Sequence, residues 1–516
     1  MKKLFNIAGP CIPGKHYMIP ALERNDQLES LIENEQYFVI HAARQTGKTT
    51  LLKSLVQHIN SQGKYHALYC SLEAVQGIDN PREGIFQIVA QLKKALFFED
   101  VKAKEVLDEI RTDADFTTLI YLSVARFSQA LEKPLVLLFD EVDCLGNGTL
   151  ITFLRQLRDG YINRDKIPFA HSIALVGMRN IRDYKARVRD DGKTLGSASP
   201  FNVITESFTI GNFSPEEVAS LYRQHTEATG QVFEEGAIQK AYYWTQGQPW
   251  LVNAIARECV EKILGNSYHQ PVTEALIDQA AENIILRRDT HIDSLLERLK
   301  EERVRRVIEP VLLGNELNIS ILADDTQYCL DLGIITDKDK RLQPSNPIYK
   351  EVIIRTLSYD TQYALYSSVE VKWIKDGLID MDRLLMDFQQ FWRENSDIWV
   401  EKYQYREAAS HLILQAFLQR VINGGGHIDR EYATGRRRMD LCVHFNGKKY
   451  PIELKLLYNE KTFAEGLEQL SAYMDTVGES TGWLVIFDRS TNKPWEEKIY
   501  HDTRTEEGKT IHVFGC

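Results

Sequence analysis

The chain has 516 residues, of which 43% are hydrophobic and 26% are charged, with 15 prolines and 30 glycines. This length predicts several domains, and this composition excludes a disordered, collagen-like or linker-dominated chain. The 62 lysines and arginines against 73 aspartates and glutamates give a net charge of −11. That balance excludes a surface uniformly suited to nucleic acid but leaves room for a local basic strip.

Cysteine spacing and apolar runs bear on where the protein works. The seven cysteines lie far apart, without the close Cys/His spacing of structural zinc sites, and are typical of reduced thiols. The first apolar run is broken at Asn6 and Pro10, unlike that of a signal peptide. No stretch approaches the roughly 18 apolar residues of a membrane span. We therefore expect a cytoplasmic protein with no membrane partner.

The first third of the chain alternates short apolar runs with amphipathic helical stretches, which predicts an α/β domain with a parallel sheet. The expected buried strands are 37–41, 66–70, 135–139, 173–176 and 203–210. A helix is expected to begin after Ser214, an N-cap residue that Pro215 follows, and the sequence stays helical to about residue 288.

Residues 291–357 predict one or two helices and then a strand pair. The first strand is expected at 328–335 and the second from residue 342, around a polar turn at 337–340. A winged helix is the most economical interpretation. A helical connector and a last α/β unit follow.

Residues 37–52 predict a strand, a turn and a helix start, and they match the phosphate-binding P-loop pattern except that Ala42 replaces its first glycine. Backbone N–H groups at such a helix N-terminus hold phosphate, Lys48 reaches the β and γ oxygens, and Thr49 offers its hydroxyl to Mg²⁺. A chance Gly-Lys-Thr at a helix start is the alternative. The expected ATP contacts are Arg44, Gln45, Thr46, Gly47, Lys48, Thr49 and Thr50.

An apolar strand that ends in two adjacent carboxylates weakens that alternative. Residues 135–139 lead directly to Asp140 and Glu141, as in a Walker B strand. Asp140 is expected to hold Mg²⁺ through water, and Glu141 to act as general base toward the attacking water. Asp143 is expected to be a solvated loop acid. The two segments together predict ATP binding and hydrolysis.

Hydrolysis also needs positive charge near the transferred phosphate. Arg179 and Arg182 follow the strand expected at 173–176, at the end of the sheet where such a sensor acts. Arg155 and Arg158 are the alternative, as a finger that reaches a neighbouring subunit. Ordinary surface charge explains all four arginines equally well.

With these segments the chain resembles AAA-like ATPases of the STAND and archaeal-ATPase type, over residues 1 to about 357. The resemblance implies a switch in which ATP binding and hydrolysis reposition a lid and a winged helix, often with self-association. The residues that support it are the stretches 9–13 and 41–50, the pair Asp140-Glu141, and the stretches 247–251 and 346–349.

The C-terminal part of the chain predicts a hairpin with an acidic face. Asn446-Gly447 between two alternating apolar runs is a strong signal for a two-residue turn, which pairs Phe445 with Lys448. The same register sets Asp440 opposite Glu453, with Lys455 next on that face. The other face gathers an apolar set suited to a core: Leu441, Val443, Phe445, Ile452, Leu454 and Leu456.

Two carboxylates and a lysine on one face suit metal-assisted phosphodiester hydrolysis, in which a divalent ion polarises the phosphate and the ammonium orients the nucleophile or stabilises charge. If the strand extends back, Arg436 and Arg438 share this face and grip the nucleic-acid backbone. A salt-bridged surface hairpin is the alternative.

This arrangement resembles the PD-(D/E)XK nuclease superfamily over about residues 403–490. The resemblance implies that Asp440 is the motif acid and that Glu453 and Lys455 form the (D/E)-x-K. It also implies a metal contact from Glu407 and an accessory pair at Gln469 and Tyr473. Met439 stands where the pattern has proline before the acid. Mg²⁺ is the expected metal, with Mn²⁺ possible at the nuclease site.

These features predict an α/β multidomain protein: a P-loop NTPase parallel sheet with a helical lid and a winged helix, followed by a PD-(D/E)XK-type α/β nuclease domain. The predicted function is an ATPase that controls a metal-dependent nuclease, with nucleic acid, DNA above RNA, as the partner and defence against mobile elements as a setting. We also expect self-association into a homo-oligomer.

Two alternatives stay open: an ATPase switch that regulates or binds DNA through an inactive nuclease-like domain, and an ATPase that acts on protein partners. The expected domains are 1–212 (ATPase), 213–289 (lid), 290–357 (winged helix), 358–402 (connector) and 403–516 (nuclease-like).

Overall fold

In the computed structural model the chain forms two compact units, Met1–His291 with Gln327–Ile334, and Ile292–Thr326 with Ile335–Cys516. Among the described residues, no helix is both long enough and apolar enough to cross a membrane. The residues that the structure describes are 3–25, 27–96, 115–178, 204–287, 290–312, 323–338, 340–357, 373–401, 410–411, 413–415, 417–418, 426–432, 439–457, 461–488, 490 and 493–516.

A five-stranded parallel sheet forms the centre of the first unit. Its strand order is β2-β3-β4-β1-β5. Every residue of β1, β3 and β4 is buried, which is why these strands are apolar throughout rather than alternating. The sequence predicts all five strands to within one residue. The strands are β1 (Tyr37–His41), β2 (His66–Ser71), β3 (Leu135–Asp140), β4 (Ser172–Gly177) and β5 (Ile204–Thr209).

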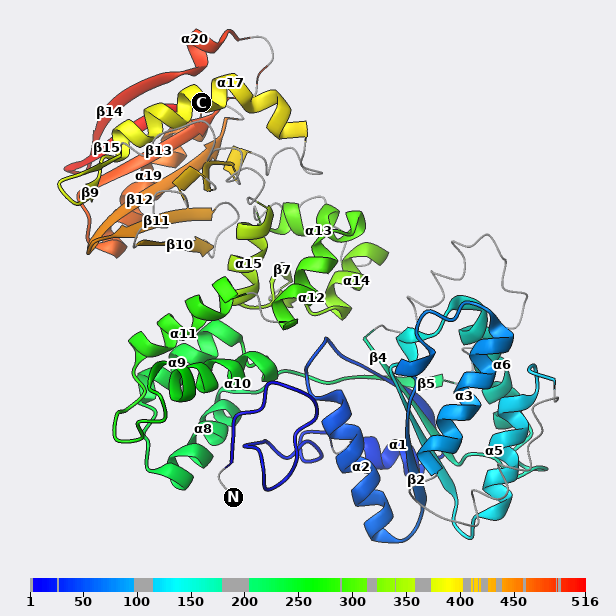
Figure 1. Ribbon diagram of the computed structural model, residues 1–516. Coiled ribbons are helices and arrows are strands. Elements are labelled where there is room, and N and C mark those ends of the chain that lie inside the picture. Colours follow the sequence, from blue (N-terminus) through cyan, green and yellow to red (C-terminus); the bar gives the residue numbers. More distant parts are fainter. Residues whose placement is uncertain are drawn as a thin grey trace. The chain divides into compact units, whose positions relative to one another are not determined.

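Helices cover both faces of this sheet (Figure 1). Phe38 and Ile40 of β1 pack into the core on one face, whereas Tyr37 and Val39 pack into the core on the other, as strand alternation requires. The first core includes α1 (Gln27–Glu33) and α2 (Lys48–Gln62), and the second includes α3 (Pro81–Leu96), α5 (Leu119–Ala130) and α6 (Asn147–Ile162). The predicted parallel α/β domain is confirmed.

A group of helices follows β5. Its first helix begins as predicted: the backbone N–H of Glu217 donates to the Ser214 side chain at 3.2 Å, and Glu217 Oε2 accepts from the Ser214 N–H at 2.7 Å. The helices are α8 (Pro215–Thr229), α9 (Glu235–Thr245), α10 (Pro249–Arg257) and α11 (Glu274–Arg287), with a π-helical segment at Glu258–Ile263 after α10.

Between residues 290 and 357, helices precede and follow a strand pair. The strand expected at 328–335 is wrong over its first half, because Tyr328 lies in a helix that ends at Asp331. Acidic Asp324 and Asp325 favour that helix start, and a short apolar run does not by itself distinguish helix from strand. The elements are α12 (Thr290–Leu299), α13 (Glu302–Leu312), α14 (Asp324–Asp331), β6 (Ile335–Lys338), β7 (Arg341–Pro344) and α15 (Pro347–Leu357). The winged helix stays a prediction.

A six-stranded mixed sheet forms the C-terminal part, in the order β10-β11-β12-β13-β15-β14. β10, β11 and β12 are antiparallel, β13 is parallel to β12 and β15, and β14 is antiparallel to β15. The strands are β10 (Gly426–Tyr432), β11 (Met439–Phe445), β12 (Lys448–Leu456), β13 (Thr481–Phe487), β14 (Tyr500–Glu506) and β15 (Lys509–Gly515).

The hairpin of β11 and β12 has the predicted register. Phe445 pairs with Lys448 and Leu441 with Ile452. Asn446 has φ 47° and Gly447 has φ 79°, and such a turn of two left-handed residues matches the twist of the strands.

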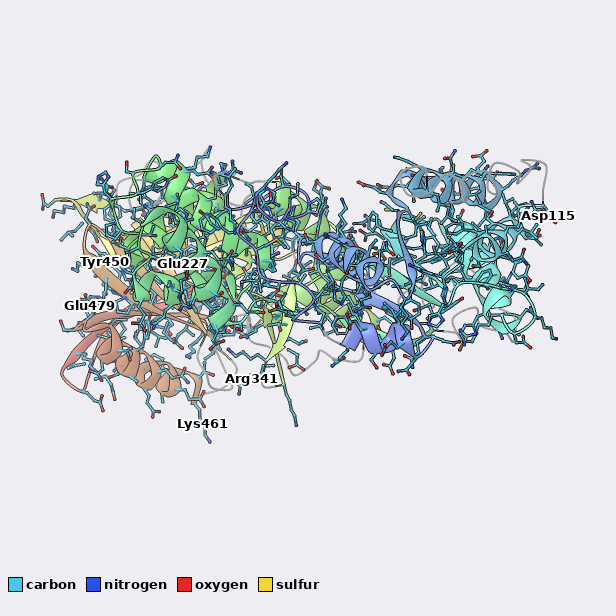
Figure 2. All side chains as sticks on the ribbon, turned by 90° about the horizontal axis from the view of Figure 1, so that it is seen from below. Asp115, Glu227, Arg341, Tyr450, Lys461 and Glu479 are labelled. Carbon is cyan, nitrogen blue, oxygen red and sulfur yellow. The ribbon has the colours of Figure 1, made fainter. Side chains whose placement is uncertain are left out.

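Two helices cover opposite faces of this sheet (Figure 1). α19 (Lys461–Val477) packs Leu470 and Met474 against β13 and β15, and the exposed side chain of Lys461 marks its first residue in Figure 2. α17 (Met381–Glu401) packs Phe388 and Trp392 against Phe487 of β13. α17 therefore lies on the sheet, although the sequence places it in a connector. Short elements complete the part: β8 (Ile374–Lys375), β9 (Leu378–Ile379) and α20 (Trp495–Lys498).

Candidate functional site

The predicted P-loop lies between the carboxyl end of β1 and the N-terminus of α2. Gln45 has φ 60° and Gly47, at the N-cap of α2, has φ 96°, so the turn uses two left-handed residues. Ala42 is buried and has a negative φ, which explains why alanine can replace the glycine of the pattern. The turn leaves the first N–H groups of α2 for a ligand.

Lys48 reaches back over this turn. Its Nζ donates to the carbonyl oxygens of Ala42 at 2.9 Å and Ala43 at 3.0 Å. Burial lowers the pKa of the Lys48 ammonium, while the nearby carboxylates of Glu141 and Asp140 raise it. A poorly solvated cation at a helix N-terminus fits the phosphates of a nucleotide.

The side chains expected to hold Mg²⁺ are brought together. The hydroxyl of Thr49 donates to Asp140 Oδ2 at 2.9 Å, although the two residues lie on different elements. Tyr69 of β2 donates to the same oxygen at 2.9 Å, and Asp140 is only 1% exposed. A hydroxyl and a carboxylate are the oxygen donors that Mg²⁺ prefers, so these residues fit the ion. The sequence analysis missed Tyr69.

Glu141, the expected general base, has a left-handed backbone with φ 58°. Such strain in a residue other than glycine is concentrated at functional sites. Burial raises the pKa of the Glu141 carboxyl, against the opposing effect of Lys48.

Asp143 corrects the sequence analysis. Its carboxylate accepts a hydrogen bond from the backbone N–H of Met178, at the end of β4, so it is not a solvated loop acid. It thereby joins the loop after β3 to the neighbouring strand end. In the sequence, only the proximity of Asp143 to Asp140 pointed to a role near the site.

A pocket beside the P-loop is lined from three parts of the first unit. The backbone N–H of Cys11 donates to the Thr50 hydroxyl at 3.0 Å, which holds the N-terminal segment at α2. Trp250 of α10 donates to the carbonyl oxygen of Ile7 at 2.8 Å, and Gln248 reaches the carbonyl oxygens of the P-loop turn at 3.4 Å. The lining includes Cys11, Thr46, Gly47, Thr50, Pro249 and Asn253.

The sequence singled out both outer stretches, 9–13 and 247–251, only through the family resemblance. The structure places both at the P-loop. Of the expected arginines, Arg179 and Arg182 lie outside the described residues. Arg155 and Arg158 lie on α6, which covers one face of the sheet.

The second predicted site contains a buried ion pair. Glu453 and Lys455 of β12 are each 1% exposed, and Lys455 Nζ donates to Glu453 Oε1. The same Nζ donates to the side-chain oxygen of Gln469 on α19. The alternative of a salt-bridged surface hairpin is therefore wrong for this pair, because α19 covers it.

Gly466 allows α19 to lie close against β12 and β13. A Cβ at Gly466 would lie 2.9 Å from Leu484 and 3.3 Å from Cγ of Lys455. Tyr473, one turn beyond Gln469, is buried. The structure thus brings Glu453, Lys455 and the predicted accessory residue Gln469 together.

The remaining predicted residues of this site are described only in part. Asp440 lies in β11, and the pairing of β11 with β12 begins at the next residue, Leu441, opposite Ile452. The position of Asp440 opposite Glu453 stays a prediction. The side chain of Asp440 lies outside the described part of the structure, as do Glu407, Arg436 and Arg438.

A phosphate-binding turn after β1 and an acidic pair at the end of β3, with β4 between these strands, define a P-loop ATPase of the AAA-like type. The chain belongs to the AAA-like domain family, whose model matches residues 15–354. A second family model, the Domain of unknown function (DUF8371), matches residues 384–491. A search of the curated proteins found no match.

Several solved structures are similar to this chain. A Walker-type ATPase of Pyrococcus abyssi is 13% identical, with a TM-score of 0.47, over 68% of this chain and 99% of that one. The ORC1 protein of Aeropyrum pernix in complex with DNA is 11% identical, with a TM-score of 0.36, over 85% and 92%. The RuvB Holliday junction branch migration motor of Thermotoga maritima is 13% identical, with a TM-score of 0.34, over 64% and 92%.

Proposed function

We propose that this AAA-like ATPase controls a metal-dependent nuclease in its own C-terminal part, which cuts phosphodiester bonds of nucleic acid, DNA in preference to RNA. The observation that carries the proposal is the buried pair Glu453 and Lys455 of β12, in which Lys455 also donates to Gln469, beside the strand β11 that contains Asp440.

Stability alone does not account for this pair. Removing two charges from water is costly, and well-packed apolar residues in their place are often as stable or more so. Glu453 and Lys455 are nevertheless buried beneath α19, whose Gln469 accepts a hydrogen bond from Lys455. Retention of a carboxylate and an ammonium there favours a chemical role.

In the ATPase site, Lys48 and the backbone of Arg44, Gln45, Thr46, Gly47 and Thr50 bind the phosphates. Thr49 and Asp140 would hold Mg²⁺, and the ion would supply positive charge that neutralises part of the phosphate charge. Glu141 takes a proton from the attacking water, and its raised pKa makes it a stronger base than an ordinary carboxylate. The pocket beside the turn takes the nucleotide base.

In the nuclease site, Asp440 and Glu453 would hold Mg²⁺ or Mn²⁺, and the ion would supply polarisation of the scissile phosphate. Lys455 orients the nucleophilic water or stabilises the developing negative charge by hydrogen bonding. Gln469 fixes the position of the Lys455 ammonium. Glu407 as a further metal contact, and Tyr473, Arg436 and Arg438 as accessory residues, complete the proposal.

We propose these domain boundaries: ATPase 1–212, lid 213–289, winged helix 290–357, connector 358–402 and nuclease-like domain 403–516. We further propose that Arg179 and Arg182 act as sensors. The proposal also includes a homo-oligomeric state, a cytoplasmic location and a role in defence against mobile elements.

Cleavage by the purified full chain tests the proposal. Plasmid DNA, linear DNA and RNA are incubated with Mg²⁺ or Mn²⁺, with and without ATP. Wild type is compared with Asp440→Ala and Lys48→Ala. We expect cutting that Asp440→Ala abolishes, with a dependence on ATP that Lys48→Ala removes. No cutting by wild type, with ATP hydrolysis intact, would instead favour a regulatory ATPase with an inactive nuclease-like domain.

A further inference from the structure

Three metal-binding side chains meet where α17 begins beside the strand pair β14 and β15. They are Asp382 of α17, His501 of β14 and His512 of β15. One ligand atom from each residue lies within 4.8 Å of the other two. We propose that they form a binding site for a divalent transition-metal ion, Zn²⁺ by preference.

The spacing of the two inner ligands fits a single ion. Asp382 Oδ2 lies 3.2 Å from His512 Nδ1. Two ligands bonded to Zn²⁺ at about 2.0–2.1 Å in tetrahedral geometry lie about 3.3 Å apart. His501 is exposed, so solvent can supply a fourth ligand beside it.

Neighbouring side chains orient these ligands. Trp483 Nε1 donates to Asp382 Oδ1 at 2.7 Å, which leaves Oδ2 of the carboxylate toward His512. The His512 ring stacks on Trp483 at 5.9 Å, and the His501 ring stacks on Phe514 at 4.2 Å, between centroids. Such outer contacts fix ligand orientation in metal sites.

This site is separate from the proposed nuclease site. Trp483 pairs with His512, whereas the next residue, Leu484, pairs with Glu453. Adjacent strand residues point to opposite faces, so His512 and Glu453 lie on opposite faces of the sheet. The donors differ as well, because two imidazoles suit Zn²⁺, Co²⁺ or Ni²⁺, whereas carboxylates alone suit Mg²⁺ or Mn²⁺.

An ion held here joins the start of α17 to β14 and β15. The site therefore holds this helix at the edge of the sheet. An ion that binds only the folded state stabilises the folded state.

The test uses the full chain after treatment with EDTA, titrated with Co²⁺ in excess Mg²⁺, which occupies the oxygen-ligand sites. We expect one Co²⁺ per chain, with the visible absorption of a low-coordinate complex, and displacement by Zn²⁺. His501→Ala, which changes an exposed side chain, should abolish the tight phase. Trp483→Phe should weaken it about 10–100-fold.

His269→Ala, at an exposed histidine of the first unit, is the matched control and should leave binding unchanged. In wild type, Zn²⁺ should also raise the melting temperature, but not in His501→Ala. Equal Co²⁺ affinity in His501→Ala and His269→Ala, or no absorption in wild type, would overturn the proposal and leave Asp382 and His512 as an ion pair.

Discussion

Two buried lysines, Lys48 and Lys455, mark the two proposed sites and are held in different ways. The ammonium of Lys48 is bound by carbonyl oxygens five and six residues before it in the chain. That of Lys455 is bound by Glu453 on the same strand and by Gln469 on a helix that follows. The first site is made by a local turn, and the second needs a strand register and a docked helix.

This difference determines which substitutions disturb each site. In the P-loop, a substitution acts mainly through the groups that contact phosphate, because the turn is a local structure. In the C-terminal sheet, a change in packing between α19 and β12 also moves the ammonium of Lys455.

The largest effect that separates the sites is expected from Lys48→Ala. Loss of the phosphate-binding cation should lower ATP turnover about 10²–10³-fold, the size found when one transition-state donor is removed. Steady-state ATP hydrolysis measures this. Lys64→Ala removes an exposed lysine paired with Glu33 and should leave turnover unchanged. A small effect of Lys48→Ala would contradict the P-loop assignment.

The next effect concerns the packing of α19. A side chain at Gly466 meets Leu484 and Lys455, so Gly466→Val should destabilise the C-terminal part by about 1–3 kcal/mol and impair cutting. ATP turnover should persist, since the P-loop does not depend on α19. Thermal unfolding and both activities are compared with those of Glu468→Ala, an exposed change on the same helix. If Gly466→Val unfolded at the same temperature as wild type, α19 would not be closely packed against the sheet at this position.

A smaller effect is expected at the residue that the sequence analysis missed in the ATPase site. Tyr69→Phe removes a hydrogen bond to Asp140 that is worth about 1.5–3 kcal/mol when the acceptor is charged. We expect Mg²⁺ to bind more weakly and ATP turnover to fall about 10-fold. A titration of ATP turnover against Mg²⁺ concentration measures both. Tyr121→Phe, on α5, is the control. Unchanged Mg²⁺ titration would separate Tyr69 from the ion site.

The smallest expected effect is a shift in pH dependence. Burial raises the pKa of Glu141, and a base acts only when deprotonated, so ATP turnover should fall as the pH drops through that raised pKa. The acid limb should therefore lie above the ordinary carboxyl value of 4.5. A profile of kcat against pH checks this, and an acid limb that persists in Glu141→Gln would assign it to another group.

Sequence reasoning performs best where the determinants are contiguous. β1, the P-loop turn and the hairpin register about Asn446 and Gly447 are local, and all appear in the structure as predicted. It fails where a short apolar run could form either element, as at Tyr328, which lies in α14. It also could not foresee Tyr69, because only the pairing of β2 with β3 brings it to Asp140.

The C-terminal site shows both outcomes. The alternation of β12 correctly set Glu453 and Lys455 on the face opposite Leu454. The burial of that pair, however, depends on α19, which the sequence connects to the site only through a resemblance at Gln469. The docking of α17 on the sheet was not predicted for the same reason, because an aromatic helix face does not show which element it packs against.

A matched pair of lysine variants on β12 decides whether the buried pair Glu453 and Lys455 serves the cleavage of nucleic acid. Cleavage of linear DNA with Mn²⁺ is compared for Lys455→Met and Lys448→Met, because Lys448 is exposed on the same strand. We expect Lys455→Met to cut more slowly by about 100-fold or more, with ATP turnover intact, and Lys448→Met to cut as wild type does. Equal cutting by both variants and wild type would show that Lys455 takes no part in cleavage.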